Sequence, residues 1–353
     1  MKKFLKIALL TVFACGSTQI SGNVGDDIKK AFQKAGADIK KAFEPLTISA
    51  KEDDYQRKLK KIKIPTITGK IGIFTTSDIH ALKEGITGKK RWHIDAILKI
   101  AKGLYANQFN LGNRTYIVSC PGDLVHGTTE EEIAKNAALY KSMPYANTGS
   151  IERIRTFREV FLDPLDKAGI LVLLGSGNHD YSDVTRKGLD QVKKRHGSLT
   201  YAVKLGKILY ISLDLYPDEK QLEWLKKTME AEKTKEGYKP TVLAFHFNLV
   251  PDPAGWWANL HELGELIGNS KGKKERENFI AAIKGKNIQL ILNGHRHKTQ
   301  MATFEGIATL TAGGGQLPLS LFDENGNYEK TIFFEESAAG PKFQGEVKNP
   351  IQK

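Results

Sequence analysis

The chain has 353 residues, 40% hydrophobic and 26% charged, which excludes a protein that is disordered throughout. A formal charge of +13 favours anionic partners, but no zinc-finger spacing or aromatic RNA-binding motif accompanies it, so we expect no nucleic-acid partner. Two cysteines are too few for a disulfide framework.

The first residues have the pattern of an export signal. Three lysines among the first six residues precede an apolar run, 7–14, that is too short to span a bilayer. The run ends in VFAC, which resembles a bacterial lipobox with Cys15 as the lipidated residue. We therefore predict a signal or lipoprotein signal peptide over residues 1–15, with ordinary cleavage near Ser21 as the alternative. The mature protein is then exported, either as a periplasmic protein or as a membrane-anchored lipoprotein.

Residues 16–67 predict a basic amphipathic helix followed by a charged linker. The hexapeptide DIKKAF begins at Asp27 and again at Asp38, eleven residues later, which is close to three helical turns. Its Ile and Phe residues therefore share one face, and most of the lysines lie elsewhere. A helix over residues 24–44 would suit an anionic membrane surface. Packing of its narrow apolar stripe on the rest of the protein explains the pattern equally well.

From residue 68 to residue 336, apolar runs of strand length alternate with helix-like segments. Two helices are predicted, over 92–104 and 130–140. Asp323 to Gly326 has the composition of a hairpin turn between strands at 319–322 and 330–334. The remaining strands are predicted at 71–74, 115–119, 170–174, 208–213, 241–245, 288–292 and 307–311. The alternation predicts an α/β fold, and the tail 337–353, which is rich in Gly, Pro and Lys, is expected to be flexible.

Polar side chains follow five of these strands, at the points where the strands end. They are Asp78 and His80, Asp123, Asn178, His246, and the pair His295 and His297. Loops converge at the carboxyl ends of strands in open α/β sheets, so we expect these residues to meet. Oxygen and imidazole donors without a thiolate suit divalent cations. Glycines directly before Asp123, Asn178 and His295 would let the backbone approach the ions.

Five blocks of the calcineurin-like metallophosphoesterases resemble, in the same order, five segments of this chain: Asp78-x-His80, Gly122-Asp123, Gly177-Asn178-His179-Asp180, His246 and Gly294-His295-x-His297. The resemblance covers residues 68–336 and implies a sandwich of two mixed β-sheets flanked by helices, here preceded by the N-terminal amphipathic helix. It also implies two divalent ions, and the oxygen and imidazole donors fit Mn, Fe, Zn and Ni alike.

The resemblance implies a role for each matching residue. Three residues would hold the first ion: Asp78, His80 and His297. Three others would hold the second: Asn178, His246 and His295. Asp123 would bridge both ions. His179 would donate a proton to the leaving oxygen or contact the phosphoryl group, and Asp180 would orient His179.

Four further residues are candidates for the substrate pocket. His126 stands three residues after Asp123, where purple acid phosphatases carry Tyr, and it either lines the site or is an ordinary loop residue. Trp256 and Trp257 follow His246 in a loop, where an indole either stacks on a nucleobase or sugar or plugs the loop. Arg296 either contacts a phosphate or points into solvent.

The remaining residues of these types are assigned structural places. His93, His196 and His261 are expected at the surface. Cys120 ends an apolar strand without a cationic neighbour, so we predict a buried core residue and not a nucleophile.

The implied activity is hydrolysis of a phosphomonoester or phosphodiester by a metal-bridging hydroxide. A small phosphate ester is then the partner, and an exported setting favours diesters. The alternative is a catalytically inactive binding protein that has kept the metallophosphoesterase fold and is attached to the membrane.

Overall fold

The computed structural model describes residues 67–82, 85–127, 148–182, 186–215, 217–249 and 270–349, all within one compact unit. The predicted signal at 1–15, the helix at 24–44 and the linker up to residue 66 lie outside the described residues. The predicted helix 130–140 lies outside them too. Within the described ranges, no helix is both long enough and apolar enough to cross a membrane.

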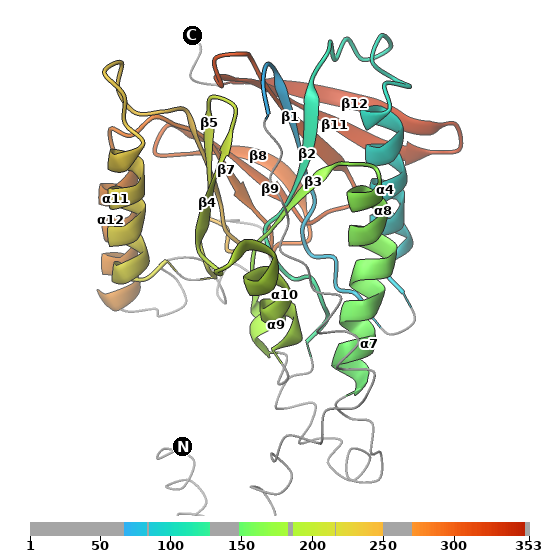
Figure 1. The fold of residues 1–353 in the computed structure, drawn as a ribbon, viewed down its shortest axis with the longest axis horizontal. Helices are drawn as coiled ribbons and strands as arrows, with labels where there is room; N and C mark the ends of the chain where they lie inside the picture. Colours follow the sequence, from blue (N-terminus) through green and yellow to red (C-terminus); the bar gives the residue numbers. More distant parts are fainter. Residues whose placement is uncertain are drawn as a thin grey trace, which may run out of the picture. The chain divides into compact units, whose positions relative to one another are not determined.

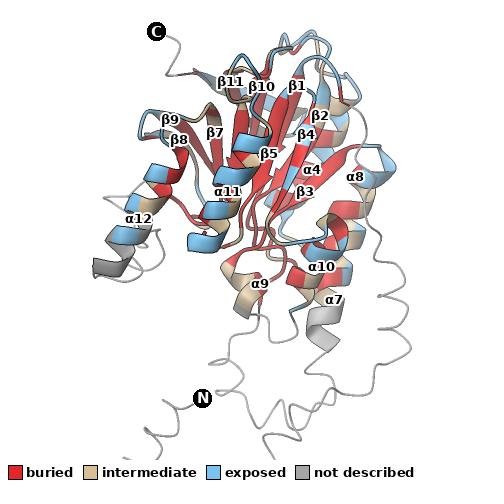
Figure 2. Cartoon of the chain, turned by 60° about the vertical axis from the view of Figure 1, so that its left-hand side comes forward, coloured by how far each residue is buried: buried red, intermediate tan, exposed pale blue. Residues whose placement is uncertain are grey.

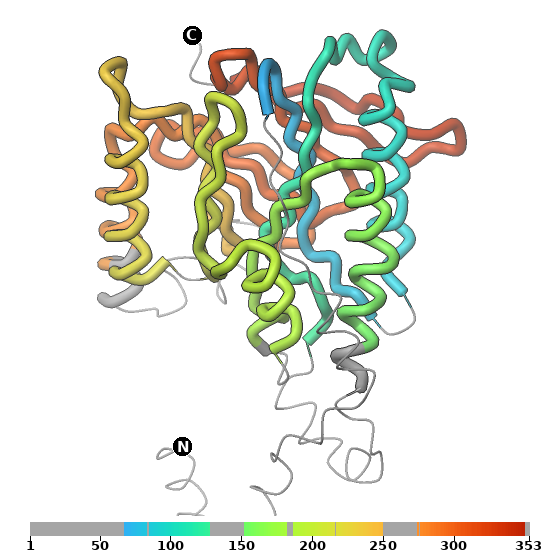
Figure 3. Tube along the Cα trace, in the orientation of Figure 1, coloured from blue at the N-terminus to red at the C-terminus, as the bar shows by residue number. Residues whose placement is uncertain are grey.

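The first of two mixed sheets has six strands in the order β12-β11-β10-β1-β2-β3 (Figure 1). Its parallel strands are β1 (Ile71–Thr75), β2 (Thr115–Cys120) and β3 (Leu171–Leu174). Antiparallel strands continue the sheet from β1: β10 (Leu317–Phe322), β11 (Tyr328–Ser337) and β12 (Gly340–Lys348). The chain therefore returns at its end to pair with its first described strand, as the blue and red segments of Figure 3 show.

The second sheet also has six strands, in the order β4-β5-β6-β7-β9-β8. Its four central strands are parallel: β5 (Ile208–Ser212), β6 (Thr241–Ala244), β7 (Ile288–Asn293) and β9 (Ile307–Ala312). Antiparallel strands form both edges: β4 (Tyr201–Leu205) and β8 (Thr299–Phe304). The hydroxyls of Ser119 in β2 and Tyr210 in β5 are 2.8 Å apart, which joins the two sheets.

Helices flank this sandwich on both sides (Figure 1). α4 (Gly88–Ala101) lies near β1 to β3, together with α7 (Thr148–Thr156), the π-helical turn Phe157–Leu162 and α8 (Asp163–Lys167). α11 (Glu219–Ala231) and α12 (Ser270–Ile283) pack in one apolar cluster with β5, β6 and β7. The remaining helices are α9 (Asn178–Ser182) and α10 (Lys187–His196).

Several strands of the sandwich are covered on both faces, which explains why their sequences are apolar throughout. β1, β3, β5 and β6 are buried along their whole length, and β1, β3 and β5 are red in Figure 2. Strands of this kind are continuous apolar runs without alternation. Cys120, at the end of β2, is also fully buried, and burial raises the pKa of its thiol, as predicted for a core residue.

The prediction of two mixed sheets flanked by helices is confirmed. The hairpin between β10 and β11 is also where it was expected, with a turn closed by Gly326 N–H donating to Asp323 O over 3.1 Å. The helix predicted at 92–104 begins earlier, at Gly88, and ends at Ala101.

The prediction of a flexible tail over 337–353 is wrong for residues 340–348. They form β12, an edge strand that pairs antiparallel with β11, and Asn349 Nδ2 donates to Tyr328 O over 2.9 Å. Backbone pairing stabilises this strand although most of its side chains are exposed. Residues 350–353 lie outside the described ranges.

Candidate metal centre

The predicted ligands come together where five strands end, three from the first sheet and two from the second. Hydrogen bonds between the loops hold them there. Asp78 N–H donates to Gly122 O over 3.2 Å, and His80 N–H donates to Asp123 O over 3.0 Å. Gly294 N–H donates to His246 O over 2.9 Å, which joins the loops of β6 and β7. The site is therefore built by loop–loop contacts at the carboxyl edge of both sheets.

Asp78, His80, Asp123 and His297 form a first group, in which one donor atom of each lies within 4.8 Å of all the others. His80 Nε2 is 3.0 Å from His297 Nε2 and 3.5 Å from Asp123 Oδ2. His297 Nε2 is 3.4 Å from Asp78 Oδ1. Two donors that bind one cation at about 2.0–2.2 Å lie roughly 3.0–3.5 Å apart, so these side chains fit a single ion.

Asp123, His246 and His295 form a second group of the same kind. Asn178 joins it, since its Oδ1 is 3.0 Å from His246 Nε2 and 2.9 Å from His295 Nδ1. His246 Nε2 is also 3.2 Å from Asp123 Oδ2. Asp123 thus belongs to both groups, as expected of a carboxylate between two ions. The seven residues that the sequence singled out as ligands all lie in this one place.

Contacts behind the donors fix their orientation. His246 Nδ1–H donates to Pro121 O over 3.0 Å, which turns Nε2 toward Asp123. His295 N–H donates to both oxygens of Asp78, each over 3.1 Å. Asp123 Oδ1 accepts from the backbone N–H of His179 over 2.9 Å, so that Oδ2 faces the imidazoles. Such outer contacts are what hold a metal site in shape.

The site contains buried negative charge that positive charge must balance. Asp78 and Asp123 are 4% and 1% exposed, and buried carboxylates are stable only when they are paired. Burial raises the pKa values of both carboxyl groups, but the neighbouring histidines lower them by a larger amount, so both groups stay ionised. Burial lowers the pKa of His246, yet the Asp123 carboxylate outweighs it and raises that pKa to about 9. A proton on His246 thus occupies a place where a cation fits.

The backbone of the site is strained. Eight non-glycine residues in the described ranges have a positive φ, and five of them are predicted ligands: Asp78, His80, Asp123, His295 and His297. Non-glycine residues adopt this region at an energetic cost and do so mostly at functional sites. Both His295 and His297, two positions apart, adopt this left-handed conformation, and both side chains reach the candidate centre.

Glycines beside the ligands allow the loops to approach each other closely, whereas the predicted approach of the backbone to the ions stays a prediction. A Cβ on Gly177 would lie 2.1 Å from Asp123 Oδ1, and one on Gly294 would lie 2.0 Å from Ser77 Oγ. Gly313, which the sequence analysis did not single out, has the same role, because its Cβ would lie 2.7 Å from Asp78 Oδ2.

His179 and His126 lie beside the first group. The ring centroid of His179 is 4.5 Å from that of His80 and 5.0 Å from that of His126. His126 Nδ1 is 3.4 Å from His80 Nδ1, so His126 contacts a predicted ligand, and its place in a substrate pocket stays a prediction.

Asp180 is fully buried behind the ligand loops. Its carboxylate accepts from Gly177 N–H over 2.9 Å and from Leu124 N–H over 3.1 Å, which ties the loop after β3 to the loop after β2. Burial, and then the charge of Asp123, raises the pKa of Asp180 to about 8. Its predicted role in orienting His179 stays a prediction.

The remaining candidates for the substrate pocket are Arg296 and the two tryptophans. Arg296 is only 3% exposed, which rules out the alternative that it points into solvent. Trp256, Trp257 and His261 lie outside the described residues.

Two residues of α4 that the sequence did not indicate, His93 and Lys90, are buried behind the site. His93 was expected at the surface, but it is buried, accepting from Thr76 Oγ1 over 2.9 Å and donating through Nε2 to Gly315 O over 3.2 Å. Lys90 Nζ donates to Gly313 O over 3.2 Å, and burial lowers the pKa of Lys90 to about 8. Three consecutive glycines after strand 307–311 were the one sequence signal of this contact.

His196, also expected at the surface, is half-buried. Its Nε2 accepts from Leu174 N–H over 3.0 Å, and its ring stacks on Tyr201 with centroids 4.1 Å apart.

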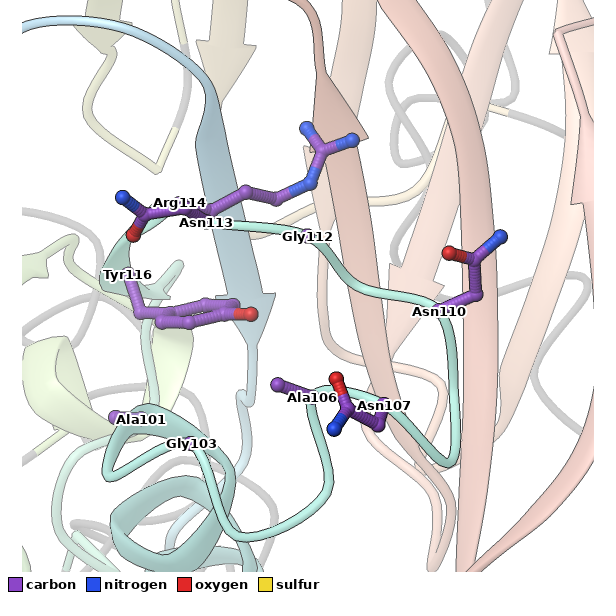
Figure 4. A pocket seen from close by; sticks show the side chains of 9 residues that line it. All are labelled: Ala101, Gly103, Ala106, Asn107, Asn110, Gly112, Asn113, Arg114 and Tyr116. Atoms are coloured by element: carbon purple, nitrogen blue, oxygen red, sulfur yellow. The ribbon is translucent and has the colours of Figure 1, made fainter.

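A cavity of about 530 Å³ lies elsewhere, lined by nine residues between Ala101 and Tyr116 (Figure 4). It adjoins the first residues of β2, whereas Asp123 follows the last ones. The cavity is therefore separate from the candidate metal centre.

The sandwich and the paired His and Asp groups define a protein of the metallophosphoesterase class. The profile of the calcineurin-like phosphoesterases matches residues 72–299, more than half of the chain, and the protein belongs to this family. No protein with a curated description matches it.

Several solved structures are similar to this chain at low sequence identity. A dimetal phosphatase from Danio rerio is 12% identical with a TM-score of 0.52, and the match covers 79% of this chain and 98% of that one. A 5′-nucleotidase from Candida albicans is 9% identical with a TM-score of 0.43, covering 80% of this chain and 54% of that one. A calcineurin-like phosphoesterase from Bacillus subtilis is 13% identical with a TM-score of 0.39, covering 79% and 89%.

Proposed function

We propose that this protein hydrolyses a phosphate ester at a centre of two divalent cations. The observation that carries the proposal is the pair of donor groups that share the Asp123 carboxylate. Asp78, His80, Asp123 and His297 would hold one ion, and Asp123, Asn178, His246 and His295 the other. Bound there, the ions would supply an activated water and neutralise charge on the phosphoryl oxygens.

The donor set suits this chemistry because it leaves the centre positive. Asp78 and Asp123 are the two anionic ligands, whereas the amide and the imidazoles are neutral donors. Burial lowers the pKa of His80 to about 4, so this imidazole is unprotonated at neutral pH and ready to bind. Two carboxylates neutralise only part of the charge of two divalent ions, and an anionic phosphoryl group is attracted to the remainder.

His179 is the residue that we assign to the leaving group. Its backbone N–H is fixed on Asp123 Oδ1, which directs the side chain to the edge of the first group, beside His80. There the imidazole contacts the phosphoryl group or donates a proton to the departing oxygen. The exported setting that the N-terminus predicts favours a phosphodiester, so we propose diesters as the substrate class.

The test uses the metal-loaded protein with p-nitrophenyl phosphate and bis-p-nitrophenyl phosphate in the presence of Mn²⁺, with metal analysis of the same preparation. We expect two ions per chain and turnover, faster on the diester. Asp123→Ala should lose both ions and the activity together, because Asp123 belongs to both groups. Asp95→Ala, on the exposed side of α4, is the matched control and should retain both.

Two outcomes would contradict the proposal. An Asp123→Ala variant that kept its full activity would show that the centre is not the site of hydrolysis. A wild-type protein with two bound ions and no turnover on either ester would instead favour the binding protein that the sequence left as an alternative.

A further inference from the structure

His126 has a defined position although it follows the last residue of β2 by several residues. Its backbone N–H donates to Ala81 O over 3.2 Å. Its carbonyl oxygen accepts from Arg153 Nη1 of α7. The main chain is thus held on both sides, and the half-buried ring lies against two side chains of the candidate centre, His80 and His179.

The two nitrogens of His80 face different neighbours. Nε2 lies 3.0 Å from His297 Nε2 and 3.5 Å from Asp123 Oδ2, on the side of the first donor group. Nδ1 lies on the other side, 3.4 Å from His126 Nδ1. An imidazole that binds a cation through Nε2 carries its proton on Nδ1, and that proton needs an acceptor. His246 shows the same arrangement, with Pro121 O as the acceptor.

The ring of His126 makes a second contact of a different kind. It lies nearly parallel to the ring of His179, with an interplanar angle of 25° and centroids 5.0 Å apart. His179 in turn meets His80 edge-on, at 84° and 4.5 Å. The Nδ1 atom of His126 therefore contacts His80, whereas the face of its ring contacts His179.

We propose that His126 is a positioning residue with two separable roles. Its Nδ1 accepts the proton of His80 Nδ1 and so fixes His80 toward the first ion. Its ring face supports His179 in the orientation that meets the substrate. This inference rests on the proposed function, because both roles act through residues of the dinuclear centre.

Three substitutions separate the two roles. His126→Asn places an amide oxygen close to the position of Nδ1, so it keeps the acceptor and removes the ring. His126→Phe keeps a ring and removes the acceptor, and His126→Ala removes both. The acceptor should govern the affinity for the first ion, and the ring should govern kcat once both ions are bound.

The experiment measures the affinity for each of two Mn²⁺ equivalents by calorimetric titration, then kcat and KM at saturating Mn²⁺ with bis-p-nitrophenyl phosphate. We expect first-ion affinity to fall about 10- to 100-fold in the Phe and Ala variants, the usual effect of losing an outer contact, and to stay near wild type in the Asn variant. At saturating Mn²⁺, kcat should fall in the Asn and Ala variants and be retained in the Phe variant.

His196→Asn is the matched control, because His196 also stacks on a neighbouring ring and makes one backbone hydrogen bond, but outside the centre. It should leave the affinities for both ions unchanged.

Equal affinities in all three His126 variants would overturn the first role, and equal kcat values would overturn the second. A third Zn²⁺ equivalent that is lost in His126→Ala would overturn both, because the donor atoms of His80, His126 and His179 also lie within 4.8 Å of one another and would then hold an ion themselves. A wild-type protein that binds no ion would count against the proposed function instead.

Discussion

Gly177 allows the loop after β3 to touch the loop after β2. We predict that Gly177→Ala displaces Asp123, because the added Cβ would lie 2.2 Å from the Asp123 backbone nitrogen, which cannot move without its loop. Both ions should then be lost, as measured by metal analysis of the purified variant. Gly88→Ala, where nothing lies within 4 Å of the added atom, is the control and should bind two ions. Wild-type metal content in Gly177→Ala would refute the close approach.

A second prediction concerns the pH dependence of metal binding. The Asp123 carboxylate raises the pKa of His246 to about 9 in the ion-free protein, although burial alone would lower it. A cation at His246 must displace this proton, so affinity for the second ion should rise with pH by about tenfold per unit up to about pH 9 and then level off. Calorimetric titrations with Mn²⁺ between pH 7 and 9, in two buffers, give both affinity and proton release. An affinity that does not change over this range would contradict the prediction.

How far the sequence leads depends on whether a signal is local. The predicted ligands sit directly after strands and in a recognisable order, so Asp78, Asp123 and His246 were found without knowing the fold. His93 reaches Gly315, 222 residues away, and its position in a helix says nothing about that partner. His126 was left open for the same reason, since its contact with His80 depends on how two loops meet.

At the scale of elements, the buried contact of α4 with the 313–315 segment predicts that the stability of the protein depends on pH. Burial, and then the charge of Lys90, lowers the pKa of His93 from 6.5 to about 3, so His93 stays neutral in the folded protein while the unfolded chain takes up a proton below pH 6.5. The contribution of His93 to the free energy of unfolding is therefore fully present above pH 6.5. Below pH 6.5 this contribution falls by about 1.4 kcal/mol per pH unit, down to about pH 3.

His93→Gln should remove this acid sensitivity, since the amide nitrogen of Gln can still donate to Gly315 O and does not titrate. At pH 7 the variant should be less stable by about 1 kcal/mol, because the Thr76 hydroxyl loses its acceptor. Urea unfolding at pH 5 and pH 7 gives the slope. Lys99→Gln, exposed on the same helix, is the control. A slope equal to that of the wild type would show that His93 does not carry the effect.

Elements that the sequence revealed are those with a strong apolar run. β1, β5 and β6 are buried on both faces and could be assigned from composition alone. β12 is mostly exposed and contains Gly, Pro and Lys, so its strand character comes from pairing with β11 and not from its own side chains.

For the molecule as a whole, metal removal should lower thermal stability. Ions that bind only the folded protein stabilise it, by about 2.7 kcal/mol for one ion at a concentration 100-fold above its Kd. We expect Mn²⁺ to raise Tm by about 5–10 °C above that of the EDTA-treated protein, measured by calorimetry. The Asp123→Ala variant should show no such rise. An unchanged wild-type Tm would mean that the buried carboxylates do not bind cations.

The shared carboxylate also has a mechanical consequence. Asp78, Asp123 and Asn178 come from the first sheet, whereas His246 and His295 come from the second, so a pair of ions would clasp the two layers at one edge. His80 and His297 are 217 positions apart along the chain, so an ion held by both joins segments that meet only in the folded protein. The cations would then act as a reversible cross-link between the two sheets. After the ions are removed with EDTA, the protein should open first where the two sheets meet at this edge. Faster hydrogen exchange at the ends of β2 and β6 would reveal this opening.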